Sequence, residues 1–300
     1  MITVNAAPPF ATIQDLGRTG FRDSGVPVSG LADRDSGVAL NALLGNDPNA
    51  AMIEWAVAGG TLRFEIACTV AIGGAVVECT VDGRAVAPWT PIEVRAGAEL
   101  QVSRFIRGRF LLVAVRGGID VPVVMGSRST LLSAALGGLE GRRLRNGDSL
   151  PIGDAPGGAV HGEAAPSGAA HRGATRSAAT TGPASFAGMI HVMRGPQAAL
   201  FGERAWTTFS STDFVVSRAS DRTGYRLEGA EIDNTVDAAL PSEPTCVGAI
   251  QLPKGGTPIV IMNDGPTIGG YPKIAVIRSS WISMFAQLTP GDTVRFEIDE

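Results

Sequence analysis

The stretch Val76-Val77-Glu78-Cys79-Thr80-Val81-Asp82-Gly83-Arg84-Ala85-Val86 predicts a β-hairpin. Its two valine-rich runs, Val76–Val81 and Arg84–Val86, flank Asp82-Gly83. An Asp-Gly pair in this position favours a two-residue type I′ turn, because both turn residues need positive φ. Neighbouring runs are short and apolar in the same way and predict further strands: Thr61–Ile66, Thr69–Ile72 and Arg109–Val115.

The whole chain has the composition of a β-rich protein. Its 39 Gly and 19 Pro favour many turns over long helices. Tight turns with Gly at the third position recur before strand-like runs: Arg95-Ala96-Gly97-Ala98, Arg145-Asn146-Gly147-Asp148 and Thr289-Pro290-Gly291-Asp292. Two helices are expected, one from Leu31 to Leu44 ended by Gly45-Asn46, and one with Ser280 as its N-cap. We therefore predict a mainly β fold with a few short helices.

A change of composition divides the chain. The residues from Asp154 to Ser185 are mostly Ala, Gly, Ser and Thr, and Val160 is their only apolar side chain apart from Ala and Pro. Such a segment buries too little surface to offset the entropy of ordering. We predict a linker or surface loop over 154–186, between an N-terminal domain (1–153) and a C-terminal domain (187–300).

Charge and residue usage exclude several classes of function. The net charge is −4 and no basic stripe is present, which argues against a nucleic-acid partner. No apolar run is long enough to cross a bilayer, and the start lacks the pattern of a signal peptide. Three cysteines without a Cys-x-x-Cys pair favour thiols in a reducing cytoplasm. With only three histidines, neither a metal site nor a Ser-His-Asp triad is expected.

Two polar, glycine-bounded motifs in the first half are candidate sites. In Gln14-Asp15-Leu16-Gly17-Arg18, the Asp and Arg can clamp a carboxylate or form an ion pair that holds a loop. The motif is followed by Gly25-Val26-Pro27-Val28-Ser29-Gly30-Leu31-Ala32-Asp33. Further along, Met125-Gly126-Ser127-Arg128-Ser129-Thr130 offers hydroxyls and backbone amides to an anion, or is an ordinary serine-rich turn.

Two more candidate motifs lie in the second half. Ser220-Asp221-Arg222-Thr223-Gly224-Tyr225-Arg226-Leu227 places Arg222 and Arg226 on one face of a strand, where they can recognise a carboxylate or phosphate or join a surface ion network. Asn263-Asp264-Gly265-Pro266-Thr267-Ile268-Gly269-Gly270-Tyr271-Pro272-Lys273 follows a predicted strand. Asp264 can orient a water there or cap a tight turn.

At these motifs the chain resembles the family of 5-oxoprolinase C subunits, also described as biotin-dependent carboxyltransferase-like or as the second subunit of allophanate hydrolase. The resemblance covers nearly all of the chain outside 154–185, including Gly117 to Thr130 and Gly137 to Arg142. It implies two cyclophilin-like β-barrel domains with a cleft between them. The cleft positions of the family map onto Asp15, Arg18, Ser29, Asp33, Arg222, Asp264, Thr267 and Tyr271.

The resemblance also implies a complex and a reaction. The expected partners are the A and B subunits of 5-oxoprolinase, of which the second is kinase-inhibitor-like, and together the three would hydrolyse 5-oxo-L-proline to L-glutamate with ATP. No P-loop motif occurs here, so ATP is expected on the partners and the chain alone is expected to be inactive. Arg222 or Arg18 would hold anionic groups, and Asp264 or Asp15 would orient the water. The chain departs from the family at two places. It has Pro266 where the family usually has Gln. It also has Gly30-Leu31-Ala32-Asp33 where the family usually has Gly-Ala-Leu-Asp or Gly-Ala-Met-Asp.

Two other functions stay open. The first is the carboxyltransferase component of a urea carboxylase-like system, with biotin on another chain, because Lys254 and Lys273 each follow a proline and do not lie between methionines. The second is a non-enzymatic antagonist that binds a kinase-inhibitor protein. The antagonist would keep its activity after loss of every cleft Arg and Asp, whereas either enzyme would not.

Overall fold

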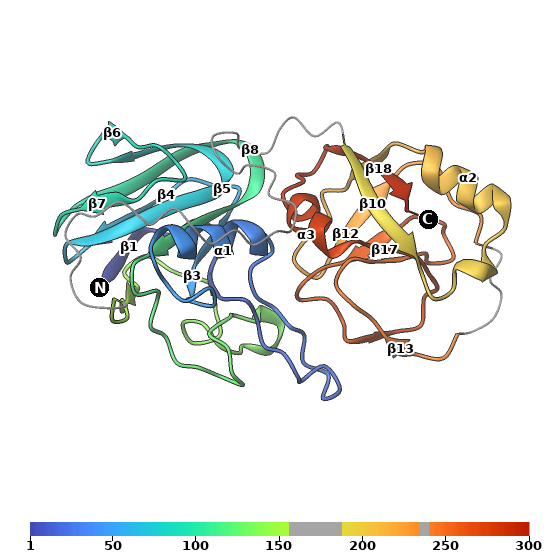
Figure 1. Ribbon diagram of the computed structural model, residues 1–300, viewed down its shortest axis with the longest axis horizontal. Helices are drawn as coiled ribbons and strands as arrows, with labels where there is room; N and C mark the ends of the chain where they lie inside the picture. Colours follow the sequence, from blue (N-terminus) through green and yellow to red (C-terminus); the bar gives the residue numbers. More distant parts are fainter. Residues whose placement is uncertain (156–187, 235–239, 300) are drawn as a thin grey trace.

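The structure, a computed structural model, describes residues 1–155, 188–234 and 240–299. Two β-rich halves lie side by side, and helix α3 (Ser279–Ala286) lies where they meet (Figure 1). The range predicted as a linker lies outside the described residues except for Asp154 and Ala155, as do His161 and His171. Across the described ranges, no helix has the length and apolar character needed to span a membrane.

The N-terminal half is one antiparallel sheet of nine strands that curls around a core (Figure 1). The strands are β1 (Ile2–Ala6), β2 (Ala11–Gln14), β3 (Met52–Ala56), β4 (Gly60–Phe64), β5 (Cys68–Val81), β6 (Arg84–Ala85), β7 (Ile92–Val94), β8 (Glu99–Val115) and β9 (Ser149–Leu150). The long strands β5 and β8 pair from Val70–Val115 to Val81–Leu100. On its other edge β8 pairs first with β4 and then with β3, so the sheet bends along β8.

The predicted hairpin and turns are confirmed. Asp82 and Gly83 both have positive φ, 49° and 76°, and connect the paired residues Val81 and Arg84. The three Gly-containing turns each close with a backbone hydrogen bond from the fourth residue to the first, 2.9–3.1 Å long, and precede β8, β9 and β18 (Thr293–Ile298). These turns can be predicted from the sequence because each one needs a residue that tolerates positive φ at a fixed position.

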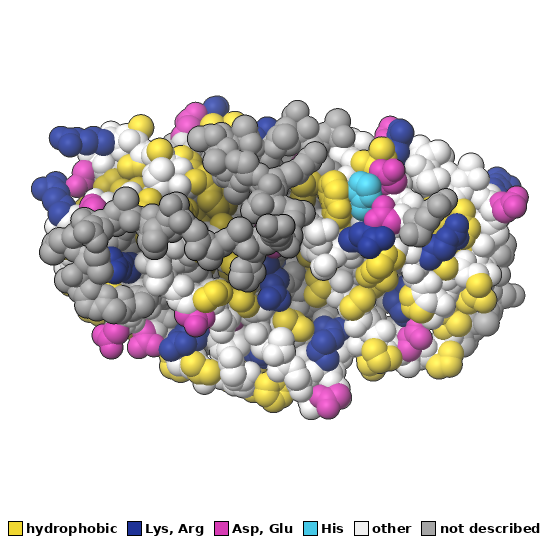
Figure 2. Space-filling view, viewed as in Figure 1, with side chains coloured by type: hydrophobic (Ala, Val, Ile, Leu, Met, Phe, Trp, Pro, Cys, Tyr) yellow, Lys and Arg dark blue, Asp and Glu magenta, His cyan; other side chains and the backbone are white. Residues whose placement is uncertain are grey.

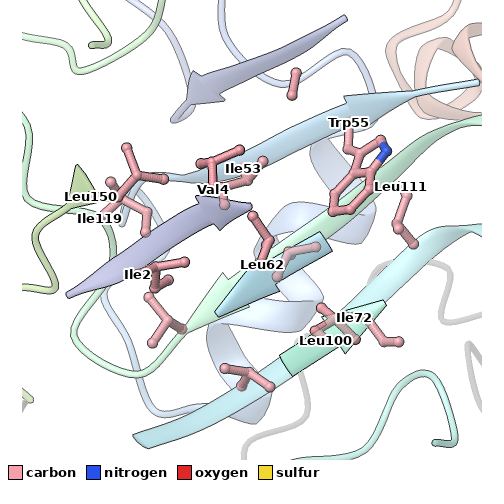
Figure 3. Close-up of a cluster of buried hydrophobic side chains, with 14 of the residues drawn as sticks. Ile2, Val4, Ile53, Trp55, Leu62, Ile72, Leu100, Leu111, Ile119 and Leu150 are labelled. Carbon is pink, nitrogen blue, oxygen red and sulfur yellow. The ribbon is translucent and has the colours of Figure 1, made fainter. Parts of the chain in front are cut away.

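The core of the N-terminal half fills the inside of the curl (Figure 3). Alternate residues of β1 and β3 point inward, among them Val4, Ile53 and Trp55, and meet Leu100 and Leu111 from β8. Trp55 is fully buried, and its indole N–H donates to the carbonyl oxygen of Ala58 at 2.6 Å. Full burial of an aliphatic side chain such as Val4 or Ile53 is worth about 1.5–3 kcal/mol. This core therefore sets the positions of the loops after β2 and β3, which reach the junction with the other half.

The C-terminal half is a closed barrel with strand order β10-β17-β14-β15-β12-β11-β18. Its strands, besides β18, are β10 (Gly188–Arg194), β11 (Phe214–Val216), β12 (Gly224–Glu228), β14 (Ala249–Gln251), β15 (Ile259–Ile261) and β17 (Lys273–Ile277). A separate ribbon joins β13 (Glu243–Pro244) to β16 (Ile268–Gly269). The mainly β class is confirmed, with one closed barrel and one curled sheet that does not close in place of two barrels.

The helices differ from expectation at their ends. Helix α1 (Arg34–Leu43) begins later than predicted because the carboxylate of Asp33 caps it, accepting from the Ser36 backbone N–H at 3.1 Å. The predicted left-handed residue after its end is confirmed, since Gly45 follows the C-cap Leu44 and has φ 68°. The predicted N-cap Ser280 is wrong, since Arg278 occupies that position after β17. Helix α2 (Glu203–Ser211) and the short turns η1 (Leu132–Ala134) and η2 (Ala198–Leu200) were not predicted.

Candidate functional site

The two halves meet along a buried seam of paired backbone segments, named here the junction seam and formed by residues 14–18, 28–31 and 263–264. The Arg18 N–H donates to Val28 O and the Leu31 N–H to Asp15 O, both at 2.8 Å, so the first two segments run side by side. The C-terminal half joins them through Asn263, whose backbone oxygen accepts from the Ser29 N–H at 2.9 Å. Its amide nitrogen donates to Ser29 O and Leu31 O, at 3.1 and 3.0 Å.

An ion network beside the seam links Arg222 to two carboxylates. Arg222 donates to Asp264 through Nε (2.8 Å) and Nη2 (3.0 Å), and to Glu54 of β3 through Nη1. Its Nη2 also donates to Gly30 O at 2.7 Å. Burial lowers the pKa of Arg222, but the two carboxylates outweigh it and raise this pKa above its ordinary value. The network is therefore a charged bridge between the two halves.

A pocket of about 540 Å³, named here the arginine pocket, lies against this bridge. Its walls carry four guanidinium groups, from Arg109, Arg143, Arg218 and Arg222, and two carboxylates, from Asp221 and Asp264. Apolar side chains complete it: Phe10, Ala56, Val57, Phe110 and Leu132. The excess of positive charge beside an apolar wall suits a small anion with a carbon skeleton.

The four arginines of the arginine pocket differ in how many of their N–H groups already have a hydrogen-bond partner. Arg109 donates to Ser220 O at 2.5 Å and lies over the Tyr225 ring at 4.7 Å, but its Nη1 has no partner in the described chain. Arg143 lies over the Phe10 ring at 4.5 Å. Arg218 is exposed, and among the described residues no side-chain partner is seen for it. Arg109, Arg143 and Arg218 therefore retain donors for an anion, whereas Arg222 is fully engaged.

The Asp15 carboxylate accepts four hydrogen bonds, which join two loops. Its Oδ1 accepts from Ser127 Oγ (2.6 Å), Ser129 Oγ (2.5 Å) and the Gly17 N–H (2.8 Å), and its Oδ2 from the Arg128 N–H (2.6 Å). Asp15 is buried and does not line the arginine pocket. Asp15 therefore holds these loops through hydroxyl and backbone N–H groups, not through the ion pair with Arg18 that the sequence offered as an alternative, and its catalytic role stays a prediction.

Arg18 and Ser29 lie in the junction seam with their side chains fully buried. The Nη2 of Arg18 donates to Ser129 O, but its Nε and Nη1 have no partner among the described residues, and neither has the Ser29 hydroxyl. Burial lowers the pKa of Arg18, against the opposing effect of Asp15 and Asp264. Both residues thus keep unused hydrogen-bonding groups, one layer behind the arginine pocket.

Asp33 holds the two halves together and does not face the pocket. Besides capping α1, it accepts from Gln287 Nε2 at 2.6 Å across the junction. The Oε1 of Gln287 accepts from the backbone N–H groups of Arg109 and Phe110, at 2.9 and 3.0 Å. Burial raises the pKa of Asp33, and the hydrogen bonds from Gln287 and Ser36 only partly offset this.

Thr267 and Tyr271 lie apart from the arginine pocket. Both flank β16, where Thr267 is buried and its backbone oxygen accepts from the Thr245 N–H at 2.9 Å. Tyr271 is 50% exposed. Pro266 also acts through its backbone, accepting from the Thr245 hydroxyl. Of the predicted residues, the structure thus brings Arg222 and Asp264 to the pocket wall and Arg18 and Ser29 behind it.

Sequence reasoning did not single out several residues of the junction. Glu54 lies on β3, Arg109 lies on β8 within the predicted strand Arg109–Val115, and Gln287 follows α3. Arg143 directly follows the motif Gly137 to Arg142, and Arg218 lies two residues before the motif Ser220 to Leu227. Only these positions in the sequence pointed to them.

No group of three His, Cys, Asp or Glu side chains suited to a metal ion occurs among the residues that the structure describes. Lys and Arg side chains are scattered over the described part of the face in Figure 2.

The fold and the interdomain site define a class of protein. Residues 24–298 match the model of the family "Carboxyltransferase domain, subdomain A and B", and the chain belongs to this family. It is 35% identical to the 5-oxoprolinase C subunit of Escherichia coli (strain K12), over 99% of this chain and 90% of that protein. It is 32% identical to the 5-oxoprolinase C subunit of Haemophilus influenzae, over 99% and 91%. The resemblance inferred from the motifs is confirmed.

A solved structure shows the same fold in a much larger protein. The K. lactis urea amidolyase superposes with a TM-score of 0.88 at 31% identity, covering 98% of this chain and 18% of that one. The urea amidolyase of Saccharomyces cerevisiae is similar in sequence, 31% identical over 98% of this chain and 16% of its own length. The family therefore includes both separate subunits and parts of long multidomain chains.

Proposed function

We propose that this chain is the C subunit of an ATP-dependent 5-oxoprolinase and that the arginine pocket binds 5-oxo-L-proline. The observation that carries the proposal is the pocket between the halves, in which Arg109, Arg143 and Arg218 keep N–H donors without a partner in the described chain, beside an apolar wall. A guanidinium group recognises a carboxylate well, and the ring of the substrate suits the apolar wall. The identity to two proteins named as 5-oxoprolinase C subunits supports the same choice.

The proposed chemistry assigns this chain binding and orientation. ATP, held by the partner A and B subunits, phosphorylates the lactam oxygen and makes the ring carbon electrophilic. Water then attacks this carbon, and the C–N bond breaks as the nitrogen takes up a proton, which leaves an acyl phosphate. A second water attacks the carbon of this acyl phosphate, and phosphate leaves with the former lactam oxygen. The free cations of the pocket hold the carboxylate and offset negative charge on the phosphorylated oxygen. Asp264, at the pocket wall, orients the water.

Arg218→Ala is expected to raise KM for 5-oxoproline about tenfold or more without loss of stability. One hydrogen bond to a charged group is worth about 1.5–3 kcal/mol, and the Arg218 side chain has no hydrogen bond or ion pair with the described residues that the change would remove. The test measures glutamate release with ATP after co-expression with the candidate A and B subunits. Arg226→Ala is the matched control, because Arg226 is exposed on β12 and does not line the pocket. An unchanged KM for the Arg218 variant would contradict the proposal.

The carboxyltransferase family match supports a second candidate. In that proposal the same pocket receives biotin carried by another chain and a urea-like acceptor. The same co-expressed samples distinguish the two enzymes, since one releases glutamate from 5-oxoproline and the other carboxylates an acceptor only when a biotinylated carrier is added. An antagonist of a kinase-inhibitor protein would show neither reaction and would bind its partner equally well after Arg218→Ala.

A further inference from the structure

The junction seam concentrates buried polar atoms that bond to nothing in the described chain. They are Arg18 Nε and Nη1, Ser29 Oγ and Asn263 Oδ1, four of the seven such side-chain atoms among the described residues. Buried polar atoms are nearly always hydrogen-bonded, and an exception calls for an explanation. Since four of them belong to three residues of one seam, the seam keeps hydrogen-bonding capacity for a ligand or for ordered water.

Backbone pairing brings these three residues together from both halves. The segments that hold Arg18 and Ser29 run side by side, and Asn263 is hydrogen-bonded to Ser29 in both directions. Asp264, the residue after Asn263, lines the arginine pocket, and Arg222 binds the carbonyl of Gly30, the residue after Ser29. The Arg222–Asp264 pair therefore contacts both the pocket and the seam.

The free atoms define which groups a ligand must present. The Asn263 amide has a fixed orientation, because its nitrogen donates to the carbonyls of Ser29 and Leu31, which leaves its oxygen as a free acceptor. The free atoms of Arg18 can only donate, and a serine hydroxyl can do both. A matching ligand carries an acceptor oxygen and a donor N–H close together.

We propose that Arg18, Ser29 and Asn263 form an inner subsite that recognises a cis-amide edge, a carbonyl oxygen next to an N–H, as in a lactam or a cyclic urea. Arg18 and the Ser29 hydroxyl donate to the carbonyl oxygen, and Asn263 accepts from the N–H. This inference rests on the proposed function, in which the arginine pocket holds the carboxylate of the same molecule. Arg18 then lies where a cation opposes negative charge on the lactam oxygen as the amide is activated.

Ser29→Gly tests the subsite with little risk to the fold. Ser29 has φ 55°, a conformation that glycine adopts readily, and its hydroxyl bonds to no described residue. The dissociation constants of three probes are measured by calorimetry on the full chain, alone and with the candidate A and B subunits. The probes are 5-oxoproline, its lactone counterpart with a ring oxygen in place of N–H, and the cyclic urea 2-imidazolidinone. Ser24→Gly, on the exposed part of the same loop, is the matched control.

The expected result is that the wild type binds 5-oxoproline about tenfold more tightly than the lactone. Ser29→Gly should weaken binding of 5-oxoproline and the cyclic urea about five- to tenfold, with an unchanged or higher melting temperature. Equal affinities for wild type and variant, or no binding of either cis-amide probe by the wild type, would overturn the subsite and leave ordered water as its occupant. Binding of the cyclic urea that weakens in the variant, without binding of 5-oxoproline, would keep the subsite and refute the proposed function.

Discussion

Arg222→Ala is expected to lower the free energy of unfolding by about 3–5 kcal/mol and to abolish turnover by the assembled complex. Arg222 is the only described cation that donates to both Glu54 and Asp264, and its own side chain is 15% exposed. Its removal leaves two carboxylates buried at the junction without their partner. Urea unfolding measures the loss of stability, and glutamate release with ATP measures the loss of turnover.

Two further variants separate stability from function at this bridge. Arg95→Ala is the control for loss of an Arg–Asp pair, because Arg95 is 81% exposed and a surface pair such as Arg95–Asp82 contributes little to stability. The triple variant Glu54→Gln, Arg222→Met and Asp264→Asn removes all three charges together. It should regain most of the stability lost in Arg222→Ala but stay inactive. Wild-type stability of Arg222→Ala would show that the bridge does not hold the halves together.

Asp15→Asn is expected to destabilise the chain by about 3–5 kcal/mol, because four hydrogen bonds converge on this one carboxylate. An amide cannot replace it, since an –NH₂ group facing either set of donors leaves at least one of them unpaired. The change also removes a negative charge near the buried Arg18. The midpoint of urea unfolding should fall, with an unchanged slope.

The matched control for Asp15 is Asp120→Asn. Asp120 binds the Arg128 side chain at 2.8 Å on the surface, whereas Asp15 binds the Arg128 backbone in the interior. The Asp120 change should cost at most about 1 kcal/mol. At temperatures where Asp15→Asn remains folded, it should still bind 5-oxoproline. A stable variant that binds substrate normally but has lost turnover would instead support the predicted role of Asp15 in orienting water.

The sequence predicted local features well and the site only in part. The Asp82-Gly83 hairpin, the Gly-containing turns and the left-handed Gly45 after α1 depend on residues a few positions apart, and all are observed. Arg222 and Asp264 were predicted to act at one place, and they do lie together. Arg18 was predicted to line an open cleft. It is fully buried in the junction seam and does not line the arginine pocket.

Residues on regular strands could not be recognised as site residues from the sequence. Glu54 stands in the apolar strand Met52–Ala56, where a carboxylate looks like the solvent-facing member of an alternating pattern. It is buried, and both of its partners come from distant segments: the Ala32 N–H, which donates at 2.7 Å, and Arg222, which lies 168 positions away in the other half. The same holds for Gln287, which gains its partners Asp33 and Phe110 only when the halves pack together.

By itself, the sequence determined the β-rich class, the turns, the family and the residue types available for anion binding. These depend on backbone preferences and on patterns that each segment carries alone. Only the tertiary structure decided which charges are neutralised and which remain free. A charged side chain becomes a structural bridge or a binding group according to its partners, and here the partners of Arg222 come from both halves while those of Arg18 are incomplete within the described chain. Pairing between distant segments is set by packing of the whole chain, which no local pattern encodes.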